Sequence, residues 1–153
     1  DYADPYSLKA AGAEESKILV VAIEEPAYSL ATIKAAQANF PHLKIVANAV
    51  DRDHAHELID LKIEFFKRET FDSALNLAKD TLSLLGFERR QITHKARLFK
   101  QHDIKSLYES HPYFRDEEQR LAISKKLRAD LERIFAVDET KFENKNKEES
   151  KKS

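Results

Sequence analysis

Two β-branched apolar runs, separated by a segment of helical character, constrain the fold of this chain more than any other feature. Residues 17–23 (KILVVAI) are apolar after the first position, as expected of a strand buried on both faces of a parallel sheet. Residues 44–50 (KIVANAV) form a second, softer run. Between the runs, Ser29 is expected to cap a helix that Pro41 ends. Strand, crossover helix and strand make a βαβ unit, which is nearly always right-handed.

The same alternation extends to both sides of this unit. Asp51 is a natural N-cap for the next helix, and residues 63–66 follow it as a short third strand. Ahead of the first run, residues 6–11 suggest a short helix that Gly12 ends. The order α-β-α-β-α-β predicts an α/β fold with a parallel sheet.

From Thr70 the alternation stops, and a single amphipathic helix is predicted over residues 70–86. Leu77 and Leu84 widen its apolar stripe beyond one face, and Gly86 ends it. A helix that is apolar over so much of its circumference needs cover on two sides. We expect one side to face its own sheet and the other to face a second subunit.

The last part of the chain is predicted to be helical and then disordered. Two short helices are expected at 89–101 and 104–110, with Asp103 as the N-cap of the second. Asp116 and Gln119 resemble a capping box that opens another helix. From residue 137 onward, charges of both signs mix with few apolar residues, which favours disorder.

Composition excludes several classes of function. The chain has two glycines, Gly12 and Gly86, which lie too far apart to form a phosphate-cradling Gly-rich loop. It has no cysteine, so thiolate catalysis and Cys-ligated metals are excluded. The net charge of −1 argues against a nucleic-acid binder. Because methionine is also absent, we expect the chain to be part of a longer polypeptide. We expect this part to begin midway through a doubly wound domain.

Two charged clusters are the candidates for binding chemistry that the residues alone offer. One lies on residues 51–57, where His54 and His56 would point about 200° apart on a helix, so we expect no metal there. The other is the basic stretch 89–100, for which an anion site and a solvated helix face both stay open. No serine or histidine falls in a nucleophilic motif, and we expect no catalytic residue.

Several segments together resemble one known family over roughly residues 1–110. They are YADP at residues 2–5, VAIEEP, FPHLKIVANAVDRDH, RETFDSAL at residues 68–75 and ARLFKQHDIK at residues 96–105. The chain resembles the cytosolic nucleotide-binding regulatory domain (KTN/RCK, TrkA-N type) of Kef-type glutathione-gated potassium efflux antiporters. The RETF segment and the HDI segment, whose Arg68 and Asp103 lie 35 residues apart, are the most specific markers.

The resemblance implies a function in gating rather than in catalysis. Paired domains of this family hold a membrane antiporter closed while glutathione is bound, and bulky glutathione adducts release potassium. It implies a homodimer through the 70–86 helix, an antiporter domain in the same polypeptide, a soluble oxidoreductase activator as a further partner, and a location at the cytoplasmic face of the bacterial inner membrane. An adenine nucleotide, NAD(H) or AMP, is the family's cofactor.

The resemblance also implies site residues, position by position. Arg68 falls where the family places an arginine on a glutathione carboxylate, and a surface arginine paired with Glu64 or Glu69 is the alternative. Asp103 replaces the family's asparagine, and an ionised carboxylate would repel the carboxylate of glutathione. Asp4 and Glu24 are the residues that would border the nucleotide.

The predicted organisation is therefore the C-terminal half of a Rossmann-like parallel sheet followed by a helical segment for dimerisation and regulation. We place a partial regulatory domain at residues 1–69, a crossover helix with a ligand and dimer segment at 70–136, and a charged tail at 137–153. Two alternatives stay open: the C-terminal half of a nucleotide-dependent oxidoreductase, and a nucleotide-sensing subunit of a potassium-uptake system.

Overall fold

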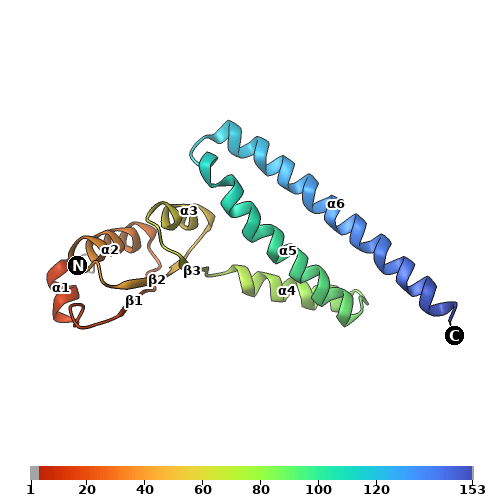
Figure 1. The fold of residues 1–153 in the computed structure, drawn as a ribbon, viewed down its shortest axis with the longest axis horizontal. Helices are drawn as coiled ribbons and strands as arrows, with labels where there is room; N and C mark the ends of the chain where they lie inside the picture. The colour runs from red at the N-terminus through yellow and green to blue at the C-terminus, as the bar shows by residue number, and fades with distance from the viewer. Residues whose placement is uncertain (1–3, 153) are drawn as a thin grey trace. The chain divides into compact units, whose positions relative to one another are not determined.

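The computed structural model describes residues 4–152 and divides the chain into two compact units, Asp1–Asn76 and Leu77–Ser153. Tyr2 and Ala3 of the YADP segment lie outside the described residues. The helices and strands are shown in Figure 1. In chain order they are α1 (Pro5–Ala10), β1 (Ile18–Val21), α2 (Pro26–Asn39), β2 (Lys44–Ala49), α3 (Arg52–Asp60), β3 (Phe65–Arg68), α4 (Phe71–Leu84), α5 (Arg89–Ser110), the 3₁₀ turn η1 (His111–Tyr113) and α6 (Glu117–Ser150).

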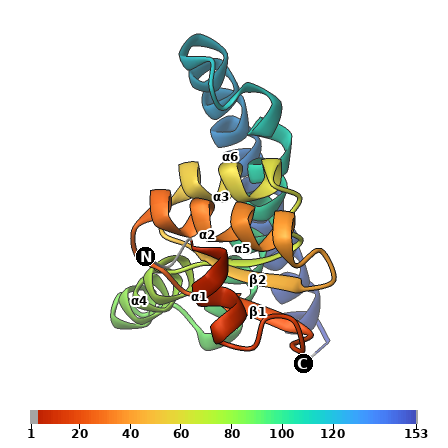
Figure 2. The ribbon, with the colours of Figure 1, turned by 90° about the vertical axis from the view of Figure 1, so that its left-hand side faces the viewer.

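The first unit is built on a three-stranded parallel sheet in the order β1-β2-β3. Ile18 pairs with Lys44 at one end of the sheet, and Ala49 pairs with Arg68 at the other. The crossover helices α2 and α3 lie on the same face of the sheet (Figure 2). The predicted α/β fold with a parallel sheet is confirmed, although β1 is shorter than its apolar run and β3 begins two residues later than predicted.

The two predicted helix caps of this unit have different outcomes. Asp51 caps α3 as predicted, because its Oδ1 accepts a hydrogen bond from the backbone N–H of His54 at 2.7 Å. The prediction for Ser29 is wrong. Helix α2 begins at Pro26 with Glu25 as its N-cap, and Ser29 lies inside the helix and is fully buried. Proline needs no N–H partner in the first turn, so the helix starts one turn earlier than a serine cap predicts.

The core of the first unit lies between the sheet and helices α2 and α3. Ile33 of α2 and Leu58 of α3 are the largest fully buried apolar side chains, and they face a sheet whose central strand contributes Ala47 and Ala49. Small side chains on the central strand let a helix approach the sheet closely. These contacts hold β2 between β1 and β3. They thereby fix the position of the edge that the carboxyl ends of the three strands form.

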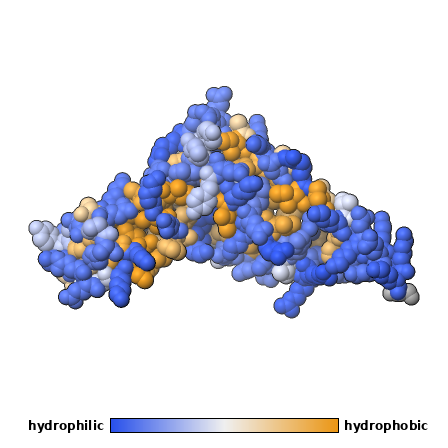
Figure 3. Space-filling view, in the orientation of Figure 1, coloured by the Kyte–Doolittle hydropathy of each residue, from blue (hydrophilic) through white to orange (hydrophobic). Residues whose placement is uncertain are grey.

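Within the first unit, no described helix covers the opposite face of the sheet. Val20, Val46 and Phe65 pair in register across the three strands, and Val20 and Phe65 are 66% and 60% exposed. Apolar side chains reach the surface of this unit in Figure 3. Parallel sheets are normally covered on both faces. Within the first unit, helices therefore cover one face of this parallel sheet and leave the other face without a helix.

Helix α4 is amphipathic, yet none of its residues is buried. Leu77 and Leu84 are 69% and 90% exposed. Gly86 follows the helix at φ +89°, a conformation that favours glycine, and Phe87 N–H donates to the carbonyl of Leu82 at 3.1 Å. Gly86 thus closes the helix as predicted, and the two leucines that widen the apolar stripe, Leu77 and Leu84, remain exposed among the described residues.

Helix α5 is continuous, so the prediction of two short helices is wrong. Residues 89–110 contain no glycine or proline that would interrupt a helix. Asp103 therefore lies in the interior of α5 and is not an N-cap.

Helix α6 begins as predicted and continues further than predicted. Asp116 accepts hydrogen bonds from the backbone N–H of Gln119 at 3.1 Å and from its side-chain amide at 3.0 Å. The helix then extends to Ser150, so the expected disorder from residue 137 onward is not observed. Glutamate and lysine are good helix formers, and neither glycine nor proline occurs in this segment. No helix in the described range 4–152 combines the length and the apolar character needed to cross a membrane.

His54 is a buried histidine whose hydrogen bond fixes its protonation state. Its side chain is 2% exposed, and its Nδ1 accepts a hydrogen bond from the backbone N–H of Val50 at 3.2 Å. Nδ1 must therefore be unprotonated. Burial lowers the pKa of His54 below its ordinary value of 6.5, against smaller raising effects of Asp51 and Glu57.

We predict that the buried His54 makes folding weaker in mild acid. The folded-state pKa is lower than the unfolded-state pKa, so the unfolded chain takes up the proton first as the pH falls below 6.5. Each unit of pKa difference removes up to about 1.4 kcal/mol from the free energy of unfolding. Urea unfolding of the chain and of His54→Asn, from about pH 7.5 to about pH 5.5, measures the effect. Asparagine keeps an acceptor for Val50 but does not titrate, so identical pH profiles would contradict the prediction.

Candidate functional site

The strands of a parallel sheet end at one edge, and ligands of α/β proteins bind there. In the first unit this edge is formed by the segment after β1, which contains Glu24, by the end of β2 and by Arg68 at the end of β3. The structure thus brings the predicted residues Glu24 and Arg68 to the same edge, Glu24 after the outer strand β1 and Arg68 at the end of the outer strand β3. Asn48 and Ala49 of β2 lie between them.

Arg68 is held at this edge by an aromatic side chain. The residue is partly buried, and its guanidinium carbon lies 4.2 Å from the centroid of the Phe71 ring. Such a cation–π contact restricts the orientation of the guanidinium. Phe71 is the first residue of α4, so the start of that helix positions the arginine. Sequence reasoning did not identify Phe71, although the R-x-x-F spacing in the RETF segment was the available signal.

A carboxylate lies close to Arg68 along the chain and has its own hydrogen bonds. The backbone N–H of Glu69 donates to the carbonyl of Ala49 at 2.9 Å, which continues the strand pairing beyond β3. The side-chain amide of Asn48 donates to Oε2 of Glu69 at 3.4 Å. The end of β3 therefore presents a cation at Arg68 and an exposed carboxylate on the next residue.

The two residues predicted to border a nucleotide have different environments. Asp4 is the N-cap of α1, and its Oδ1 accepts a hydrogen bond from the backbone N–H of Tyr6 at 3.2 Å. Glu24 is exposed in the segment between β1 and α2. Asp4 therefore has a structural role of its own, whereas Glu24 is free to face a ligand at the sheet edge.

Asp103 belongs to the second unit, whereas Arg68 belongs to the first. The side chain of Asp103 is partly buried on α5, and the backbone carbonyl of Asp103 accepts a hydrogen bond from the hydroxyl of Ser106 at 2.8 Å. Because α5 continues through Asp103, this residue is not an N-cap, which was the alternative to a role in ligand binding.

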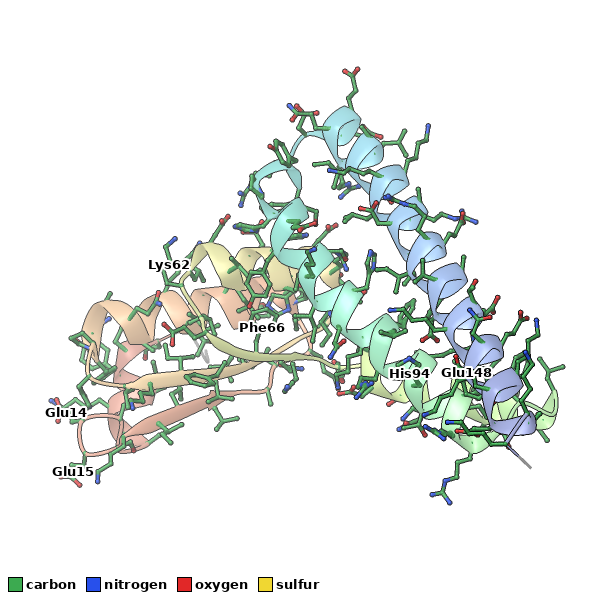
Figure 4. All side chains as sticks on the ribbon, turned by 45° about the vertical axis from the view of Figure 1, so that its right-hand side comes forward. Glu14, Glu15, Lys62, Phe66, His94 and Glu148 are labelled. Carbon is green, nitrogen blue, oxygen red and sulfur yellow. The ribbon has the colours of Figure 1, made fainter. Side chains whose placement is uncertain are left out.

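Much of the basic stretch 89–100 has a structural role in the second unit. His94 on α5 faces α6 (Figure 4), and its Nε2 lies 2.5 Å from Oδ1 of Asp138. Lys95 contacts Glu139 at 3.1 Å, and Arg97 donates to Nδ1 of His94 at 3.0 Å. The sequence left an anion site and a solvated helix face open, and these three residues follow neither interpretation, because they contact α6 or one another.

The charged cluster at residues 51–57 shows ordinary helix-start geometry. His54 and His56 are both buried, and Asp51 caps the helix. Among the described residues, no group of three side chains is placed to hold a metal ion.

Comparison with known proteins assigns both parts of the chain. Residues 73–152 match the family described as the potassium efflux system KefB C-terminal domain, and residues 1–66 match the TrkA-N domain. The first match covers α4, α5 and α6 almost completely, and the second covers the sheet up to β3.

A solved structure is similar to the chain in both sequence and fold. It is a Kef CTD of Shewanella denitrificans in an AMP-bound form, with 43% sequence identity and a TM-score of 0.70. The similarity covers 73% of this chain and 70% of that one. Because a family match over more than half of the chain agrees with a relative of this identity, the chain belongs to the family of C-terminal domains of Kef potassium efflux systems.

Proposed function

We propose that this chain is the ligand-sensing part of a glutathione-regulated potassium efflux system that exchanges potassium for protons. It does no chemistry itself and gates an antiporter domain of the same polypeptide from the cytoplasmic face of the bacterial inner membrane. The observation that supports this proposal most is the partly buried Arg68, oriented by Phe71 at the carboxyl edge of a parallel sheet in a chain similar to a Kef CTD.

The geometry of this edge suits the ends of a tripeptide such as glutathione. The guanidinium of Arg68 is a planar set of donors that matches a carboxylate. Glu69, which Asn48 contacts through its amide, is an acceptor for an amino or amide group. Gating requires that glutathione and its bulkier adducts bind the closed and open states with different affinities.

We further propose that an adenine nucleotide, AMP or NAD(H), binds at the same edge. The Shewanella denitrificans Kef CTD carries AMP, and residues 1–66 of this chain match the TrkA-N domain. Glu24 and Asp4 are the residues of this chain that would border the nucleotide.

The working assembly in this proposal is a homodimer formed through α4. The support is an amphipathic helix without a single buried residue, since helices of this length gain most of their stability from packing. A soluble oxidoreductase activator would be a further partner. The match of residues 73–152 to an efflux family favours this function over an uptake subunit and over half of an oxidoreductase.

Replacing Arg68 tests the glutathione site. In the complete efflux protein, we expect Arg68→Ala to weaken glutathione binding about 10- to 150-fold, because a hydrogen bond to a charged group contributes about 1.5–3 kcal/mol. Isothermal titration with glutathione measures the change. Lys67→Ala is the matched control, since Lys67 is an exposed cation on the neighbouring residue of β3. Equal losses in both variants, or none in Arg68→Ala, would contradict the site.

Replacing Asp103 tests the second contact. We expect Asp103→Asn to strengthen glutathione binding by about 1–3 kcal/mol, because an amide can donate to the ligand where a carboxylate repels it. The same titration gives the affinity, and thermal unfolding shows whether α5 is unchanged. Glu118→Gln is a control that removes an exposed carboxylate in the first turn of α6. An Asp103→Asn variant with unaltered affinity would show that the position does not face glutathione.

A further inference from the structure

Three side chains in contact join α5 to α6 in the second unit. His94 lies on α5, one turn before Arg97, and faces α6 (Figure 4). Nε2 of His94 lies 2.5 Å from Oδ1 of Asp138, and Nδ1 of His94 lies 3.0 Å from a guanidinium nitrogen of Arg97. The side chains of His94 and Asp138 are 36% and 19% exposed, so the contact between the helices is partly shielded from water.

The hydrogen bonds of these side chains fix the protonation state of His94. A guanidinium has donors only, so Nδ1 of His94 accepts the hydrogen bond from Arg97 and carries no proton. The ring is therefore neutral, with its proton on Nε2, and Nε2–H donates to the carboxylate of Asp138. The structure thus shows the contact that belongs to the unprotonated histidine.

A second proton on His94 has different effects at its two ring nitrogens. At Nε2, the bond to Asp138 then joins a cation to an anion, which strengthens it. At Nδ1, the new N–H faces an N–H of Arg97, and the two cations repel each other because no acceptor lies between them. Proton uptake therefore keeps the contact with α6 and removes the contact with Arg97.

The other charged groups around His94 come from both helices and are of mixed sign. They are Arg90 and Lys95 of α5, and Glu139, Lys141 and Glu143 of α6. Lys95 and Glu139 contact each other at 3.1 Å, so their charges largely offset each other at the ring. The response of His94 to a proton is therefore decided chiefly by the two groups that touch it, Arg97 and Asp138.

A neighbouring contact holds the two helices together in either protonation state. Besides its ion pair with Glu139, Lys95 lies with its Nζ 5.4 Å from the centroid of the Phe135 ring. Lysine and glutamate keep their charges throughout the range in which histidine ordinarily titrates. The helices thus remain paired while the partner of Arg97 changes.

We infer that Arg97, His94 and Asp138 form a proton-sensitive contact, which holds the guanidinium of Arg97 at neutral pH and releases it in mild acid. Histidine is the side chain whose ordinary titration falls in the physiological range. The released guanidinium is exposed on α5 and becomes available to an anionic group. This contact does not depend on the proposed function, although potassium–proton exchange would change the pH to which it responds.

Nitrogen NMR of the chain tests the protonation of His94 directly. At about pH 8, Nε2 should carry a proton and Nδ1 should not, and at about pH 5.5 both ring nitrogens should carry one. A proton on Nδ1 at the higher pH would overturn the inference, because Arg97 could not donate to a protonated nitrogen. A ring that stays neutral at the lower pH would overturn it as well.

Labelling with phenylglyoxal, which modifies guanidinium groups, tests the release of Arg97. Arg90 is the internal control, because it is an exposed arginine of the same helix. Mass spectrometry gives the ratio of labelled Arg97 to labelled Arg90, which removes the pH dependence of the reagent itself. From about pH 8 to about pH 5.5 this ratio should rise about two- to tenfold, the factor that a typical hydrogen bond contributes. An unchanged ratio would overturn the release.

The variant His94→Gln separates the titration from the structure. A glutamine can donate to Asp138 through its amide N–H and accept from Arg97 through its amide oxygen, but it takes up no proton. The labelling ratio should therefore be the same at both pH values in His94→Gln. His102→Gln is the matched control, since it removes another histidine of α5 and should keep the rise. An equal rise in His94→Gln would overturn the inference. Circular dichroism shows whether each variant remains helical, and the measurements on the unaltered chain need no variant.

Discussion

The pairing of β2 with β3 is the interaction on which the rest of the structure depends. It places Arg68 opposite Ala49 and extends through the hydrogen bond from Glu69 to Ala49. Since α4 begins three residues after Arg68, the same register fixes where that helix starts and sets Phe71 against the guanidinium. A shift of β3 by one residue would turn Arg68 to the other face of the sheet and separate it from this support.

The parts of the fold that depend on local chemistry were predictable from the sequence. The apolar runs gave the strands, and Asp51, Asp116 and Gly86 marked helix ends through hydrogen bonds to their near neighbours. Two predictions that rested on a single capping residue, Ser29 and Asp103, were wrong. Ser29 is no cap because Glu25 and Pro26 open the helix one turn earlier, and Asp103 is no cap because such a residue is also tolerated inside a long helix.

Long-range contacts explain the errors in the second unit and in the site. Composition favoured disorder after residue 137, but Asp138 and Glu139 contact His94 and Lys95, which lie 44 residues earlier. Windows of local sequence do not contain such pairs. Arg68 was found through its motif, whereas the contact between Asn48 and Glu69 joins two strands and could not be read before the register was known.

The position of α4 gives the proposed gating a physical route. Its first residue, Phe71, contacts the arginine of the candidate ligand site, and its exposed leucines belong to the second unit, because the boundary between the units falls inside the helix. A ligand that binds the guanidinium of Arg68 acts on its cation–π contact with Phe71, and therefore on the first turn of α4. If α4 is also the dimer helix, ligand affinity and subunit arrangement share one element. Linkage then requires that dimerisation changes the affinity for the ligand by the same factor by which the ligand changes the affinity of dimerisation.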